Sequence, residues 1–328
     1  MVISISKKLW ELSFTDQGMY RTIKKILSWV EDGKHKLIFE KGIDTDQIIS
    51  NQRYINYSET LKAIITNSFY SEDEEKIVRI TYTDQLSSSE KNIFYDGLLL
   101  VETTKDKELH YIDVSKVDTY LGRLLYIIVE NTVSDKDFVQ SVYKYFKGRP
   151  LSTETEVQFL HGGGNTISNV ASENSEHPVR MICIIDSDKK YPLHPGSNKV
   201  KNLLPLCEKR NLQLITLSKR EIENYIPPEA LKQWLSKEKR EAETEHPYFN
   251  FNIEQRSFFD MKYGLKEIDL KKKEIMSIYQ GYNPDHIQKG FGKTVWKAFR
   301  EISSGSENYF KDSEFELKNM VQKIDSLL

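Results

Sequence analysis

The spacing of apolar and polar positions changes along the chain. Up to about residue 120, one segment with helical spacing, MYRTIKKILSWVED, is followed by short alternating or clustered runs, among them KLIFEK, KIVRITYTDQ and ELHYIDV. This mixture predicts an accessory α+β domain at 1–120. No recurrent catalytic spacing occurs in it, so its role stays open, with partner binding or homo-oligomer formation as candidates.

From residue 121 onward, short apolar runs alternate with helical segments. The runs are LLYIIVE, EVQFLHGGG, VRMICIIDSD and LQLITLS. Apolar strands alternating with helices predict a mainly parallel sheet covered by helices on both faces, which is an α/β fold. Ser134 and Asp137 resemble a capping box, which predicts a helix starting just after the first strand. We therefore expect an α/β domain at 121–228.

The remainder of the chain is rich in charge and helical spacing. It begins after Pro227-Pro228 with PEALKQWLSKEKREAETE, and a last helical segment covers roughly 308–328. We expect a helical C-terminal region at 229–328.

The composition indicates that the chain can fold without disulfides or a structural metal. Its 328 residues are 38% apolar and 11% aromatic, and 47 basic residues nearly balance 49 acidic ones. A protein of this size buries a core without disulfides or a structural metal. If nucleic acid binds, a local basic patch must attract it, because the formal net charge is only −2.

The cysteines and the termini indicate the compartment. Cys183 and Cys207 form no CxxC motif, and Cys183 lies inside an apolar run, which favours reduced thiols. No signal-peptide pattern and no apolar run near the roughly 18 residues of a membrane span occurs. We expect a cytoplasmic protein without a membrane partner.

Acidic residues follow three of the four predicted strands. Glu130 closes the first, Asp186 and Asp188 follow the third, and Glu221 and Glu223 follow the fourth after a short loop. The carboxyl ends of parallel strands meet at one edge of a sheet, so these side chains can converge there. Any one of these acids alone is more often a helix cap or a solvated loop residue, and the order of all of them is the stronger signal.

Several carboxylates close together need a compensating charge. Like charges at low dielectric raise one another's pKa values and resist ionisation. A hard divalent ion such as Mg²⁺ removes that penalty, and carboxylate, water and phosphate oxygens are its usual ligands. Such a centre suits phosphoryl transfer.

This arrangement resembles a Toprim domain, the catalytic fold shared by topoisomerases, bacterial primases and overcoming-lysogenisation-defect (OLD) type nucleases. The resemblance is carried by Glu130, by Asp186-Ser187-Asp188 and by REIENYIP, and it covers residues 121–228. The segment Arg220–Tyr225 is most similar to the nuclease branch, which includes small Toprim proteins of bacterial antiphage systems.

The resemblance implies an endonuclease that uses Mg²⁺ or Mn²⁺ to cut DNA or RNA. Glu130, Asp186, Asp188 and Glu223 match the family's metal-binding acids, with Glu221 second to Glu223, and Lys262 is the counterpart of a downstream catalytic lysine. OLD proteins carry their own ATPase, and this chain does not. A separate protein partner such as an ATPase, in an antiphage defence system, therefore follows as an expectation.

Two positions depart from the family pattern. Asn131 replaces the glycine that usually follows the first glutamate, and asparagine is expected to tolerate the left-handed turn that glycine permits. The acid often found four residues after that glutamate has its counterpart in Asp135, five residues on, as a further metal ligand.

Three other sequence features are weaker evidence of function. The lipase-like sequence His161-Gly162-Gly163-Gly164 has no GxSxG partner, so its glycines are expected to serve close backbone approach or a tight strand exit. GFGKT lacks the first glycine of a phosphate loop. Candidate contacts to the nucleic-acid backbone are the lysines after the third strand: Lys189, Lys190, Lys199 and Lys201.

Two alternatives remain open. One is a topoisomerase- or primase-like Toprim enzyme, against which the short chain and REIENYIP argue. The other is a catalytically inactive, Toprim-like interaction or regulatory subunit, with Asn131 as its first sign.

Overall fold

The computed structural model divides the chain into two compact units. One comprises Met1–Arg123 with Arg180 and Asp325–Leu328, and the other comprises Leu124–Ser175 and Met181–Ile324. The structure describes residues 2–40, 42–68, 76–82, 98–104, 107–175, 180–210, 212–303 and 309–328. The predicted boundary near 120 lies close to this division, whereas 229–324 belong to the same unit as the second sheet.

The first unit contains a five-stranded sheet in the order β2-β1-β3-β5-β4. β1, β2, β3 and β5 pair in parallel, and only β4 runs antiparallel. Its elements are β1 Val2–Ile5, α1 Lys7–Ser13, α2 Gln17–Glu31, β2 Lys36–Ile38, α3 Thr45–Ser50, α4 Ser58–Ser68, β3 Lys76–Thr81, β4 Leu98–Thr104, β5 Lys107–Asp113 and α6 Val117–Leu121, with 3₁₀ helices at Gln52–Tyr57 and Val114–Lys116.

The expectation of a segregated α+β domain is wrong for this unit. Parallel strands need a crossover connection, and α1 and α2 supply it between β1 and β2. The predicted helix and three strands are confirmed as α2, β2, β3 and β5. β1 and β4 are absent from the prediction.

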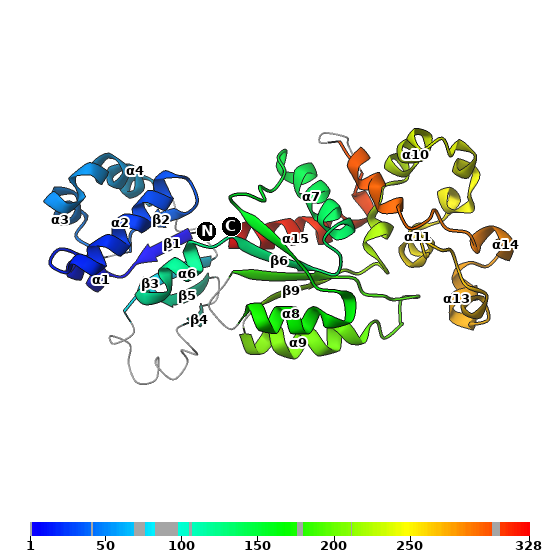
Figure 1. Ribbon diagram of the computed structural model, residues 1–328, viewed down its shortest axis with the longest axis horizontal. Helices are drawn as coiled ribbons and strands as arrows, with labels where there is room; N and C mark the ends of the chain where they lie inside the picture. The colour runs from blue at the N-terminus through cyan, green and yellow to red at the C-terminus, as the bar shows by residue number, and fades with distance from the viewer. Residues whose placement is uncertain are drawn as a thin grey trace. The chain divides into compact units, whose positions relative to one another are not determined.

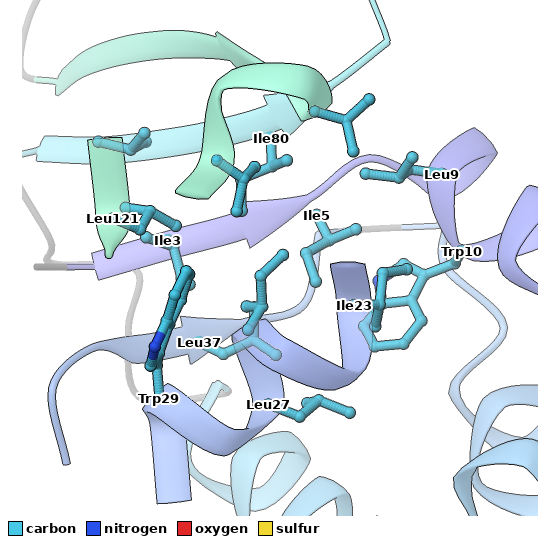
Figure 2. Packing of buried hydrophobic residues seen from close by; sticks show 14 of the residues in the cluster. Ile3, Ile5, Leu9, Trp10, Ile23, Leu27, Trp29, Leu37, Ile80 and Leu121 are labelled. Atoms are coloured by element: carbon cyan, nitrogen blue, oxygen red, sulfur yellow. The ribbon is translucent and has the colours of Figure 1, made fainter. Parts of the chain in front are cut away.

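The apolar side chains of this unit form one core. Ile3 and Ile5 of β1 pack with Trp10 and with Leu27 of α2 around the sheet (Figure 2). All four side chains are at most 2% exposed. The helical spacing of α2 thus directs its apolar face onto β1.

The second unit contains a four-stranded, entirely parallel sheet in the order β7-β6-β8-β9. Its strands and helices are β6 Leu125–Val129, α7 Ser134–Lys147, β7 Val157–His161, α8 Ile167–Asn174, β8 Met181–Ile185, α9 Asn198–Arg210 and β9 Gln213–Thr216, with 3₁₀ helices at Gly164–Thr166 and Ile222–Tyr225. α7 lies on one face of the sheet, and α8 and α9 lie on the other (Figure 1). The predicted α/β arrangement of alternating strands and helices is confirmed.

The central strand of this sheet is buried along its whole length. All five residues of β8, Met181–Ile185, are buried, since β6 and β9 flank it and helices cover both faces. Cys183 in β8 and Cys207 in α9 are free and buried, so the predicted core role of Cys183 is confirmed.

The C-terminal half of the second unit is built from short helices, as expected for 229–328. They are α10 Pro228–Lys237, α11 Ile253–Phe258, α12 Glu267–Leu270, α13 Lys273–Ile278, α14 Pro284–Ile287 and α15 Glu314–Leu327, with 3₁₀ helices at Glu241–Glu245, Pro247–Asn250, Val295–Glu301 and Lys311–Ser313. Among the described residues, no helix combines the length and the apolar character needed to cross a membrane.

The first unit also encloses a histidine. The His35 side chain is 5% exposed, and its Nε2 lies 3.1 Å from the carbonyl oxygen of Leu121. Burial, reinforced by the positive charge of Arg180, lowers the pKa of His35 from 6.5 to about 3. The folded chain therefore holds this ring neutral at pH values where the unfolded chain protonates it.

We expect acid to destabilise the chain through His35. Below pH 6.5 the unfolded state binds more protons, so the free energy of unfolding falls as the pH drops toward 3. The loss from this group is roughly 2 kcal/mol at pH 5. Denaturant unfolding of His35→Gln between pH 7.5 and 4.5 should show a flatter pH dependence than wild type. Equal slopes would contradict a neutral buried ring.

Candidate metal centre

The predicted acids lie together at the carboxyl edge of the second sheet. Glu130 directly follows β6, and Asp186 directly follows β8. Glu221 and Glu223 follow β9 after residues 217–220, and Glu223 lies in the 3₁₀ helix Ile222–Tyr225. Because β6, β8 and β9 are neighbours in the sheet, their ends bring these side chains to one place.

One pair of acids shares the ammonium group of Lys199. Its Nζ lies 2.6 Å from Glu130 Oε2 and 2.7 Å from Asp188 Oδ2. The other Glu130 oxygen, Oε1, is buried and accepts no hydrogen bond. Burial raises the pKa of Glu130, whereas the Lys199 hydrogen bond and charge oppose that rise.

A second pair shares the ammonium group of Lys262. Its Nζ lies 3.0 Å from Glu223 Oε1 and 3.4 Å from Glu221 Oε2. The Glu223 side chain is fully buried, and neither of its oxygens has a partner with hydrogen-bond geometry. Burial raises the pKa of Glu223 to about 7 despite the nearby charge of Lys262. The contact with Lys262 therefore offsets only part of the cost of burying this carboxylate.

Asp186 has the strongest electrostatic conflict of these acids. Its Oδ1 is buried without a hydrogen-bond partner. Burial raises its pKa well above the usual range, and four neighbouring carboxylates raise it further: Asp135, Glu223, Glu130 and Glu221. At an effective dielectric constant near 20, two carboxylates about 5 Å apart repel by about 3 kcal/mol. Ionised Asp186 consequently requires a further positive charge.

The donor set fits a hard divalent cation. Three of the acids contribute a buried carboxylate oxygen with neither a hydrogen bond nor an ion pair: Glu130 Oε1, Asp186 Oδ1 and Glu223 Oε2. Oxygen ligands of this type are those that Mg²⁺ and Mn²⁺ accept. Among the described residues, however, no group of three or more His, Cys, Asp or Glu side chains is already arranged to hold a metal ion. The two lysine ammonium groups separate the acids into pairs instead.

The turn after β6 differs from both expectations for it. Asn131 does not adopt a left-handed backbone. It closes the turn through its side chain, since Asn131 Oδ1 accepts a hydrogen bond from the Val133 amide at 2.8 Å. The predicted capping box is wrong as well, because α7 begins at Ser134 itself and Val133 provides no side-chain cap.

Asp135 supports this turn. Its Oδ2 accepts from the Asn131 amide at 3.0 Å, and its Oδ1 accepts from Ser134 Oγ at 2.7 Å. Burial raises the pKa of Asp135, while these hydrogen bonds lower it. Asp135 therefore lies among the acids, but one of its oxygens already holds the backbone beside Glu130 and the other holds the Ser134 hydroxyl.

A strained turn orients the Asp186-Ser187-Asp188 segment. Asp188 has a φ of 53°, a conformation that residues other than glycine rarely adopt. Its amide donates to the carbonyl of Arg220 at 2.9 Å, and Ser187 Oγ donates to the carbonyl of Lys219 at 2.6 Å. The end of β8 is thus tied to the segment that follows β9. Backbone strain of this kind persists where surrounding structure enforces it, often at functional sites.

The segment at 220–227 (REIENYIP) supplies two of the acids and also holds its loop in place through hydrogen bonds. Asn224 Nδ2 donates to the carbonyls of Arg256 and Phe259 at 2.7 and 2.8 Å. The hydroxyl of Tyr225 lies 2.8 Å from Glu316 Oε2 and accepts from the Ser218 amide. Sequence reasoning assigned no role to these two residues beyond the motif. They fasten the loop of Glu221 and Glu223 to α11 and α15.

Arg220 and Asp260 position Lys262. Arg220 Nη2 donates to Asp260 Oδ2 at 2.7 Å, and Asp260 Oδ1 accepts from the Lys262 and Tyr263 amides. Both side chains are buried. Sequence reasoning missed this pair. The only available signal was that Arg220 belongs to REIENYIP and that Asp260 lies two residues before the candidate lysine.

The lysines proposed to bind nucleic acid do not share one environment. Lys190 Nζ pairs with Asp269 of α12 at 2.9 Å, and Lys199 bridges the acids. Lys201 is exposed on α9, and Lys189 is half-buried. Only Lys189 and Lys201 of the four have no ion pair among the described residues.

The glycines after His161 carry the chain past Glu130. A Cβ on Gly162 would lie 2.9 Å from the carbonyl oxygen of Val129, and one on Gly164 would lie 3.9 Å from Glu130 Oε2. The Gly163 amide donates to the carbonyl of Glu130 at 3.2 Å. Close backbone approach, one of the two predicted roles, is confirmed. His161 itself is exposed.

No family model matches the chain, and neither the curated proteins nor the solved structures include a match.

Substitution of Lys262 should reveal how much free energy of unfolding its ion pairs with Glu221 and Glu223 contribute. In chelator-treated protein, we expect Lys262→Met to lower the free energy of unfolding by about 3 kcal/mol, because it leaves Glu223 as an unpaired buried charge. Adding Glu223→Gln should restore most of the loss. Denaturant unfolding measures both variants, and Lys201→Met, which removes an exposed lysine, is the matched control.

The contrary outcome is informative. A Lys262→Met protein as stable as wild type would mean that protons, and not the lysine, neutralise Glu221 and Glu223 in the resting state.

Proposed function

We propose that the chain is a Mg²⁺- or Mn²⁺-dependent nuclease that hydrolyses the phosphodiester bonds of a nucleic acid through a Toprim-like α/β unit. The observation that carries the proposal is the convergence of buried carboxylates from the ends of three adjacent parallel strands, with an oxygen on each of Glu130, Asp186 and Glu223 that has neither a hydrogen bond nor an ion pair. Such a set is stable as anions only with additional positive charge. The sequence similarity of Glu130, Asp186-Ser187-Asp188 and REIENYIP to Toprim nucleases supports the same conclusion.

The roles of the side chains follow from their positions. Glu130, Asp186, Asp188 and Glu223 would hold the divalent ions, with Glu221 beside them. When bound, a divalent ion in such a site lowers the pKa of water and stabilises charge on phosphate oxygens. Lys262, 28% exposed and fixed by its loop, would add a positive charge next to Glu223 where the substrate phosphate meets the acids.

The substrate class and the partner are parts of the same proposal. Lys189 and Lys201, on the segment after β8, would contact the sugar-phosphate backbone of DNA or RNA. The similarity to antiphage Toprim proteins supports a role as a cytoplasmic defence effector that acts with a separate activating protein such as an ATPase.

One observation favours a second candidate function. Lys199 and Lys262 already pair with four of the acids, and no metal-holding group is preformed among the described residues. A Toprim-like subunit that has lost catalysis and serves in protein interaction could retain these ion pairs for stability alone. Cleavage experiments separate the two functions.

Nuclease activity should require both the metal and the acids. We expect plasmid DNA or single-stranded RNA to be cut in the presence of Mn²⁺ or Mg²⁺ by wild-type protein, alone or with the products of neighbouring genes. Asp186→Asn and Glu223→Gln should each reduce the rate at least about 100-fold, since each removes charge that the metal site needs.

Lys237→Met is the control, because Lys237 is exposed and lies outside the acid cluster. Wild-type protein that binds its partner but cuts neither substrate with either metal would favour the interaction subunit.

Metal binding should also be visible without substrate. We expect millimolar Mn²⁺ to raise the melting temperature of wild type, because a ligand that binds only the folded state stabilises it by mass action. The rise should vanish in Asp186→Asn. An equal rise in both proteins would place metal binding elsewhere.

A further inference from the structure

Lys199 is held at the acid cluster by its own loop. It is the second residue of α9, and its amide donates to Ser197 Oγ at 3.1 Å. The amide of Ser197 in turn donates to the carbonyl of Ser187 at 3.1 Å. The start of α9 is therefore anchored to the Asp186-Ser187-Asp188 turn, which keeps the Lys199 side chain within reach of Glu130 and Asp188.

The ammonium group occupies the space between two strand ends. Its contacts of 2.6 Å to Glu130 and 2.7 Å to Asp188 join the ends of β6 and β8. The Lys199 side chain is 15% exposed and the Glu130 side chain is 17% exposed, so water screens this contact little. Each of the two carboxylates gives one oxygen to the lysine.

A divalent ion bound to these carboxylates would conflict with the lysine. Mg²⁺ binds carboxylate oxygen at about 2.1 Å. An ion on Glu130 Oε2 would thus lie within about 5 Å of an ammonium group that stayed in place, and the two cations would repel. The flexible four-carbon side chain of Lys199 can leave the acids without any change in the backbone.

The backbone of Lys262 is anchored as well. Its carbonyl accepts from the Gly292 amide at 3.0 Å, and its amide donates to Asp260. A Cβ on Gly290 would lie 2.6 Å from the backbone of Lys262, so the two loops are in direct contact. The two lysines differ in what they join, because Lys262 pairs with two acids of one segment, whereas Lys199 joins the ends of β6 and β8. Departure of Lys199 would therefore open a position between acids of two strands.

We propose that Lys199 occupies the position of a catalytic metal in the resting protein and is displaced when the divalent ion binds. This inference rests on the proposed function, because it assigns Lys199 a place in the same metal centre. The lysine keeps the acids folded and charged without metal. The lysine also weakens metal binding, because only the conformer with Lys199 displaced can bind the ion. If that conformer is populated at about 1–10%, the apparent affinity falls by roughly 10- to 100-fold.

Calorimetric titration of Mn²⁺ into the chelator-washed full chain tests the proposal. Lys199→Met, which removes the competing charge at similar length, should bind Mn²⁺ at least about tenfold more tightly than wild type. Lys199→Arg keeps the charge and should not bind more tightly. Lys209→Met, on the same helix and exposed, should match wild type.

A second measurement uses the wild-type protein and does not depend on the folding of a variant. Limited acetylation followed by mass spectrometry reports the reactivity of each lysine. We expect the reactivity of Lys199 relative to Lys201 to rise when Mn²⁺ is added, because the displaced amine becomes accessible.

The outcomes separate this inference from the proposed function. Equal Mn²⁺ affinity in wild type and folded Lys199→Met, or Lys199 reactivity unchanged by bound Mn²⁺, would overturn the displacement and leave the metal centre intact. Absence of Mn²⁺ binding in both proteins would overturn the metal centre and the displacement together.

Discussion

The excess of negative charge at the carboxyl edge of the second sheet is the constraint on which the rest of this site depends. Six acids lie together there: Glu130, Asp135, Asp186, Asp188, Glu221 and Glu223. Among the described residues, the ammonium groups of Lys199 and Lys262 pair with four of these acids, and the guanidinium group of Arg220 lies 3.8 Å from Glu221 Oε1. Burial raises the pKa of Asp186 and of Glu223 because it removes their charged forms from water, and neighbouring carboxylates raise both pKa values further. A site of this charge is stable when it takes up protons or further cations, and the second option is what a metal-dependent hydrolase needs.

The fold holds this charge in place through three connected turns. The end of β6 is closed by Asn131 and Asp135, and the end of β8 is tied by Ser187 and Asp188 to residues 219–220. Residues 220–225 are fastened to α11 and to the loop of Lys262 through Arg220 and Asn224. Each hydrogen bond aligns one acid relative to the next strand. The C-terminal region therefore serves the site directly, because α11 and the loop after it supply the carbonyl groups that hold Asn224, and the same loop carries Lys262.

The proposed nuclease function rests on the chemistry of the site and on the resemblance of three short motifs to Toprim nucleases. A parallel α/β sheet hosts many unrelated activities, so the fold alone supports no particular reaction. What narrows the choice is the type of donor. Carboxylate oxygens favour a hard ion, and hard ions such as Mg²⁺ serve in phosphoryl transfer.

The sequence by itself determined the alternation of buried strands and helices at 121–228, the burial of β8 and the residues that carry the acids. These are local properties, since apolar runs of four to seven residues indicate burial and a parallel sheet fixes where strand ends meet.

The sequence by itself did not determine the parallel sheet of the first unit, because strand direction depends on which distant strands pair. It predicted a left-handed Asn131, whereas a side-chain hydrogen bond closes that turn and the positive φ falls on Asp188. Only the tertiary structure decided that Lys199 pairs with Glu130, 69 residues away in the sequence, and with Asp188. The same holds for the positioning of Lys262 by Asp260. Contacts between residues so far apart follow from how the chain packs, which no local spacing encodes.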